Sequence, residues 1–134
     1  LVPEHYVPEV TQRLALYKRL ADIVRIEEVA DIRGEMLDRF GPIPAPVDAL
    51  LDVVGLRVAA RAMGVERVDA QGGRALLTFA PSTPVTPEQL LRAIGRSRGR
   101  LRMLKEYTLE AQIPSEPWPA VRAALTTLLE SLRP

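Results

Sequence analysis

Cysteine is absent from this chain of 134 residues, and histidine occurs once, at His5. These absences exclude disulfide frameworks, zinc–thiolate sites, thiol catalysis and histidine-rich metal sites. No apolar run approaches the roughly 18 residues that a membrane-spanning helix needs, and no secretory signal opens the chain. The net charge of +1 gives no overall attraction to nucleic acid or membrane. We therefore expect a cytoplasmic protein that has no membrane partner.

Motifs of independent enzymes are also missing. There is no GxxxxGK[ST] phosphate loop and no GxGxxG after a predicted strand. His5 lies in a proline-flanked segment, which is a poor place for a catalytic base. Glu27 and Glu28 fall in the first turn of a predicted helix, where carboxylates favour the positive end of the helix dipole. We expect no catalytic residue, metal site or cofactor within this chain.

The length suits one domain, and the apolar pattern changes once along it. Residues 1–8 contain two prolines and no helical period, which predicts an extended lead-in or linker tail. Residues 9–64 show helical periodicity, whereas residues 65–134 mix strand and helix patterns. The prediction is a single α+β domain over 9–134. It has three helices first, then a small antiparallel sheet with one flanking helix and a closing C-terminal helix.

The first half predicts helices over about 9–24, 27–40 and 47–63. Gly41 and Pro42 end the second helix, and Gly64 ends the third. Apolar residues recur at three- and four-residue steps, and the stripe of the first helix is wide enough to suggest burial on two sides. The residues expected inward on the first two helices are Val10, Leu14, Tyr17, Leu20, Ala21, Val24, Ile26, Val29, Ile32, Met36, Leu37 and Phe40.

The second half predicts a hairpin of strands 65–71 and 74–80 around Gly72 and Gly73, which accept the positive φ of a tight turn. Thr86 is a predicted N-cap for a helix that ends near Arg96, with Gln89 completing a capping box. Alternation over 107–113 predicts a strand with one solvated face, paired with a strand near 101–103. Ser115 is the expected cap of the last helix.

The first candidate site is a charged patch near the end of the second helix, formed by Glu35, Asp38 and Arg39. Side chains three and four residues apart share one helix surface, so this patch could dock on a complementary partner. The simpler interpretation is solvation, with Asp31, Glu35 and Arg39 forming a weak ladder. Arg33 falls within the apolar stripe, where a charge must extend to solvent, find a partner or face an interface.

The second candidate is a run of basic residues that could bind phosphate backbone. Its members are Arg92, Arg96, Arg98, Arg100, Arg102 and Lys105. No aromatic residue lies among them before Tyr107, so a base-stacking platform is missing. A solvated surface is the simpler interpretation, since all but two of the 18 basic residues are arginine and the whole chain shares this bias.

Two segments resemble a known family. Residues 6–9 with 13–21, and the run from Glu35 to Pro44 (EMLDRFGPIP), closely resemble the C-terminal domain of bacterial transcription-repair coupling factors, the Mfd family. The order of predicted elements matches, including the GVERVD segment and the two-glycine hairpin.

The resemblance implies a regulatory domain of an ATP-dependent translocase on double-stranded DNA, which would use ATP and Mg²⁺ outside this segment. Such a translocase displaces stalled RNA polymerase and recruits UvrA in nucleotide excision repair. The resemblance further implies that the domain covers the UvrA-binding surface of a UvrB-like module of the same polypeptide. Carried over by residue, that contact would involve Glu35, Asp38 and Arg39. The alternatives are DNA-backbone binding through the Arg92–Lys105 cluster and a purely structural, protective role.

Overall fold

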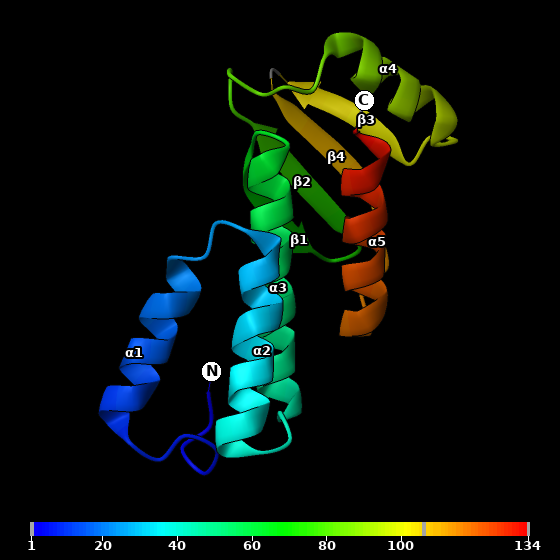
Figure 1. The fold of residues 1–134 in the computed structure, drawn as a ribbon. Helices are drawn as coiled ribbons and strands as arrows, with labels where there is room; N and C mark the ends of the chain where they lie inside the picture. The colour runs from blue at the N-terminus through cyan, green and yellow to red at the C-terminus, as the bar shows by residue number, and fades with distance from the viewer. Residues whose placement is uncertain (1, 106, 134) are drawn as a thin grey trace. The chain divides into compact units, whose positions relative to one another are not determined.

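The computed structural model describes residues 2–105 and 107–133 (Figure 1). The α+β class is confirmed, with the three helices preceding an antiparallel sheet. The chain divides into two compact units, one up to Val58 and one from Ala59 onward. The elements in chain order are α1 Val10–Ala21, α2 Ile26–Phe40, α3 Ala45–Ala62, β1 Val65–Gln71, β2 Arg74–Phe79, α4 Pro87–Arg96, β3 Leu101–Lys105, β4 Thr108–Gln112 and α5 Trp118–Ser131.

The core of the first unit is built from one side of each of its helices. Val29, Ile32 and Met36 of α2 are buried, together with Leu16 and Leu20 of α1. The inward stripe predicted for α1 is too wide: Leu20 is buried and Tyr17 packs against the core, but Val10 and Leu14 do not. Val10 and Leu14 are 59% and 63% exposed, because α1 packs on one side only. The helix also ends at Ala21, before Val24.

The prediction of a linker tail over residues 1–8 is wrong, because this segment contributes to the core. Val2, Tyr6 and Val7 are buried in the core of the first unit. The Tyr6 hydroxyl donates a hydrogen bond to the Gly41 carbonyl oxygen at 2.9 Å. Apolar side chains on a proline-containing segment can fill a core without any helical period. This segment therefore holds the C-terminal end of α2 in place.

The second unit contains the four-stranded sheet, in the order β1-β2-β4-β3 with every neighbour antiparallel. The predicted hairpin is confirmed, with φ of 62° at Gly72 and 82° at Gly73. The solvated face predicted for β4 comprises Thr108, Glu110 and Gln112, and it is wrong for the first two. Thr108 and Glu110 are only 6% and 8% exposed, because β4 is a central strand covered by side chains of its neighbours. The turn that must join the predicted strands near 101–103 and over 107–113 falls partly outside the described residues.

Helix α4 begins as predicted, whereas α5 does not. The Thr86 side chain accepts from the Gln89 backbone N–H at 3.2 Å, and the Gln89 side chain accepts from the Thr86 backbone N–H at 2.8 Å. Helix α5 starts at Trp118 with Pro117 before it, so Ser115 caps nothing. Proline disfavours helical φ and ψ in the residue before it, which keeps the helix from starting earlier. Within the described ranges, no helix is long and apolar enough to cross a membrane.

Candidate functional site

The predicted patch on α2 is organised around Glu35. Its carboxylate lies 2.8 Å from a guanidinium nitrogen of Arg19 on α1 and 3.3 Å from one of Arg39, one turn further along α2. The predicted contact between Glu35 and Arg39 is thus confirmed. The main partner is Arg19, which the local spacing on α2 could not reveal. The bridging carboxylate joins two helices at the surface of the first unit.

These contacts alter the ionisation of Glu35. The hydrogen bond from Arg19 is the largest cause that lowers the pKa of this carboxyl below its ordinary value of 4.5, and Arg39 adds to it. Partial burial of the carboxyl opposes this shift but does not cancel it, and the side chain remains 39% exposed. The patch therefore keeps a fixed pattern of charge at neutral pH, with one carboxylate between two guanidinium groups.

The other members of the patch face solvent. Arg39 stacks over the Phe40 ring, with its guanidinium carbon 5.0 Å from the ring centroid, and Phe40 in turn packs at 5.7 Å from Tyr6. Asp38 is exposed and forms no ion pair with any residue the structure describes. Arg39 is thus held in position from both sides, whereas the Asp38 carboxylate is available to a partner.

Arg33 has found partners rather than extending freely into solvent. It pairs with Asp48 of α3, and a second guanidinium nitrogen lies 3.7 Å from Asp52. This resolves the alternatives that the sequence left open for a charge in the apolar stripe. The pairing ties α2 to α3 inside the first unit.

An exposed apolar strip lies on another side of α2 from the charged patch. Ile26 and Leu37 are 53% and 55% exposed, although the sequence predicted both to face inward. With Ala30 and Gly34 between them, they line a shallow hollow of about 470 Å³. We name this surface the α2 strip; sequence reasoning missed it because the apolar positions of α2 span more of the helix than its core covers.

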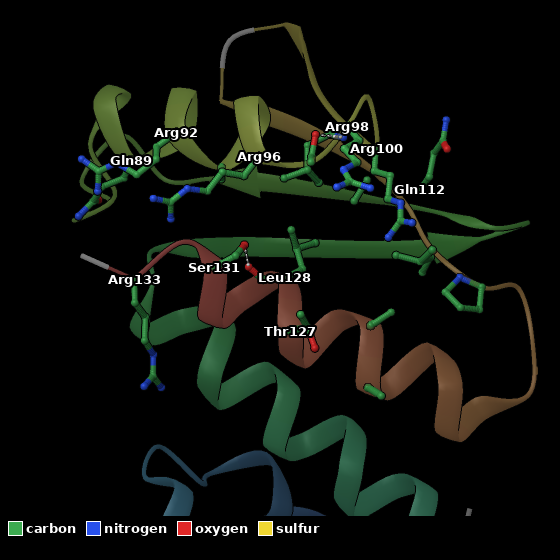
Figure 2. Close-up of a pocket in the computed structure, with 18 residues that line it drawn as sticks. Gln89, Arg92, Arg96, Arg98, Arg100, Gln112, Thr127, Leu128, Ser131 and Arg133 are labelled. Carbon is green, nitrogen blue, oxygen red and sulfur yellow. Dashed lines mark hydrogen bonds between the residues drawn. The ribbon is translucent and has the colours of Figure 1, made fainter.

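The basic cluster of the second unit is split between two places. Four of its members line one cleft together with Arg133, which the sequence analysis did not include. This arginine cleft is lined by Arg92, Arg96, Arg98, Arg100 and Arg133. Its volume is about 940 Å³. Figure 2 shows Arg92 and Arg96 on the side of α4, with Thr127, Leu128 and Ser131 of α5 facing them.

The two remaining members lie outside the cleft. Arg102 donates to the Glu110 carboxylate at 2.7 Å, and Arg74 lies 3.2 Å from the same carboxylate. Lys105 is exposed at the end of β3. The structure therefore does not bring the six predicted residues into one surface, and DNA binding by the full cluster stays a prediction.

The fold is that of a small α+β domain. Its candidate sites are two charged surfaces, the patch on α2 and the arginine cleft beside the sheet. A family model described as the TRCF domain matches residues 1–90. The chain therefore belongs to the TRCF domain family of transcription-repair coupling factors.

Relatives and a solved structure agree with this assignment. The transcription-repair-coupling factor of Escherichia coli K12 is 34% identical over 91 residues, covering 68% of this chain and 8% of that protein. The Myxococcus xanthus protein is 30% identical over 114 residues, covering 85% of this chain and 10% of its own length.

A crystal structure of the C-terminal domain of transcription-repair coupling factor is alike in fold, with a TM-score of 0.78 and 19% identity. The match covers 97% of this chain and 84% of that one. The chain thus spans about a tenth of its curated relatives, and the likeness to the solved domain extends over both units.

Proposed function

We propose that this chain is an autoinhibitory domain of a transcription-repair coupling factor and performs no catalysis of its own. Its charged patch, Glu35, Asp38 and Arg39, docks on the UvrB-like module of the same polypeptide and covers the surface that UvrA would bind. The parent protein then holds the ATP, Mg²⁺, DNA and RNA polymerase sites outside this segment. Membership of the TRCF domain family supports the placement of this chain in a transcription-repair coupling factor. The geometry around Glu35 supports the charged patch as the docking surface.

The observation that carries the proposal is the preorganised charge at Glu35. Arg19 and Arg39 hold the carboxylate from two helices, at 2.8 and 3.3 Å. Because these side chains are already held in place, they lose little conformational freedom when a partner binds. Asp38, exposed beside it, offers a carboxylate for a cation of the partner.

The proposal is tested in the parent protein by single Ala substitutions at Glu35, Asp38 and Arg39. Truncating one member of a desolvated charge pair typically costs about 2–5 kcal/mol, which would open a modest intramolecular contact. We expect each variant to bind UvrA roughly tenfold more tightly or better and to hydrolyse ATP faster. Titration of UvrA and a steady-state ATPase assay measure both effects.

Arg67→Ala is a matched control. Arg67 is an exposed arginine in an ion pair with Asp69 at 2.8 Å, on β1 of the second unit. Its loss should leave both readouts unchanged. Unaltered UvrA binding and ATP turnover in all three patch variants would contradict the proposal, and an effect of Arg67→Ala equal to that of Arg39→Ala would show that the response is not specific to the patch.

A further inference from the structure

The arginine cleft collects positive charge without any acidic neighbour in its lining. Its five guanidinium groups come from α4, the turn after it and Arg133, which follows α5, and no Asp or Glu lines the cleft. Within residues 2–105 and 107–133, none of the five forms an ion pair. Elsewhere in the same unit, Arg67, Arg74 and Arg102 each have a carboxylate partner. The cleft is therefore complementary to an anion.

The floor of the cleft is apolar and built from small or aliphatic side chains. It includes Leu101 of β3, Ala111 of β4, and Ala123 and Leu128 of α5. A ligand that fits must combine negative charge with apolar groups. Inorganic phosphate lacks the apolar part, and a volume of about 940 Å³ exceeds what it needs.

Nucleic acid matches this lining less well than a polypeptide does. No aromatic residue lines the cleft, so the bases of a single strand have no stacking platform. A duplex presents its phosphates on a wide convex surface, which reaches the rim of a concave cleft but not its apolar floor. Both forms of DNA leave the floor unused.

The arginine spacing suits an extended chain with acids at alternate positions. Arg92 and Arg96 are one turn apart on α4, which separates them by about 6 Å along the helix axis. Alternate residues of an extended chain are about 6.6–6.8 Å apart and point to the same side. Acidic side chains on one side can thus meet successive arginines while the intervening apolar side chains face the floor.

The backbone at Arg98 gives an independent indication. Arg98 follows the C-cap residue of α4 and has φ of 55°, a left-handed conformation that favours glycine. Gly99 beside it also has positive φ, at 81°. An arginine held in an unfavourable backbone conformation places a further charge at the cleft, and such outliers cluster at binding sites.

We infer that the arginine cleft binds an acidic polypeptide segment in extended conformation, in which acidic and apolar residues alternate. This surface is separate from the α2 patch, so the two proposals can fail independently. Binding should weaken with added salt, because exposed ion pairs are screened.

The test uses the 134-residue chain and a fluorescein-labelled peptide in which glutamate alternates with alanine or leucine, read by fluorescence anisotropy. We expect saturable, salt-sensitive binding that falls roughly tenfold in Arg96→Glu and clearly in Arg133→Glu. Lys105→Glu is the control, because Lys105 belongs to the linear basic cluster but not to the cleft. It should change affinity by less than about twofold.

Competing ligands decide between sources of negative charge. Unlabelled single-stranded DNA, duplex DNA and inorganic phosphate should displace the peptide only weakly. The proposal is overturned if the peptide does not bind, if either DNA binds the cleft as tightly as the peptide, if phosphate competes at equal concentration, or if Lys105→Glu weakens binding as much as Arg96→Glu.

Arg98→Gly separates binding from folding. Glycine relieves the left-handed conformation, so the variant should melt at a higher temperature than the wild-type chain while it binds the peptide more weakly. A fall in both stability and binding would mean that Arg98 serves the fold, and unchanged binding would remove it from the site; either result contradicts its assignment.

Discussion

Two glutamates, Glu35 and Glu110, are each held between two arginines, but their surroundings differ. The Glu35 side chain is 39% exposed at the surface of α2, whereas that of Glu110 is 11% exposed on a central strand. Periodicity predicted both to face solvent. The prediction succeeded on the helix, where the period of the apolar residues indicates which side faces the core. It failed on β4, because strand order decides what covers a residue and is not encoded in local spacing.

Glu35→Gln should make stability less dependent on acid pH. The pKa of Glu35 is lowered in the folded chain, so its ion pairs stabilise the fold above the ordinary carboxyl pKa of 4.5, and this stabilisation is lost as pH falls through the lower folded pKa. The variant should therefore unfold more easily than wild type near neutral pH, and the gap should narrow progressively as the pH is lowered below 4.5. Urea unfolding at neutral pH and at a series of acid pH values measures this.

Asp38→Asn serves as the neighbouring control for that experiment. Asp38 lies on the same helix and forms no ion pair among the described residues, so its replacement should lower the free energy of unfolding by less than Glu35→Gln near neutral pH. A gap between wild type and Glu35→Gln that persists unchanged at acid pH would show that the charge of Glu35 does not stabilise the fold.

Some of the residues that contact Glu35 could be predicted from the sequence. The i, i+4 contact of Glu35 with Arg39 follows from helical spacing, and the structure confirms it. Arg19 lies 16 positions earlier in the chain, so its contact depends on how α1 packs against α2. Likewise Arg133, which follows the C-terminal end of α5, joins the arginine cleft although it lies more than 30 positions from the other four arginines in the chain.

At the scale of elements, the helices and strands were predictable where local signals agree. One or two residues satisfy the backbone requirement at each of three such places. These are the capping box at Thr86, the two-glycine hairpin and the end of α2 at Gly41. The failures lie where local signals are weak. Residues 1–8 have no period but are anchored by burial, and Ser115 has cap chemistry but is separated from α5 by Pro117.

Two glycines of the chain should respond in opposite ways to the same substitution. Gly34 lies within α2 and an added Cβ would meet nothing within 4 Å, so Gly34→Ala should stabilise the fold by about 0.5–1 kcal/mol. Gly64 has φ of 71°, and an added Cβ would lie 2.5 Å from the Thr83 Cα. Gly64→Ala should therefore destabilise the fold by about 2–4 kcal/mol.

Thr83 cannot easily move away from such a Cβ, since its hydroxyl donates to the Met63 carbonyl oxygen at 2.6 Å. Thermal melts and urea unfolding of the two variants check the prediction, each serving as the control for the other. Equal shifts of the same sign would show that backbone conformation at these positions does not set the difference.

At the scale of the whole molecule, the division into two units separates two kinds of surface. The first unit presents the charged patch and the α2 strip, and the second presents the arginine cleft. The proposed inhibition requires only that the patch meets a module joined to it by the same chain. A contact of this kind acts at an effective concentration of about millimolar when the linker is short and flexible.

Tethering therefore predicts how the chain behaves when it is supplied separately. A parent protein that lacks this domain should hydrolyse ATP and bind UvrA at the raised level. Adding the 134-residue chain in trans should restore inhibition only as its concentration approaches millimolar, because the intrinsic contact is weak without the covalent link. A titration of chain into the truncated protein, followed by ATPase activity, measures this, with the Arg39→Ala chain as control. Full inhibition at micromolar concentrations of the chain would mean that the contact is strong without the covalent link. Release of this domain from the UvrB-like module would then require a ligand that competes for the patch, because a small shift in a balanced equilibrium would not suffice.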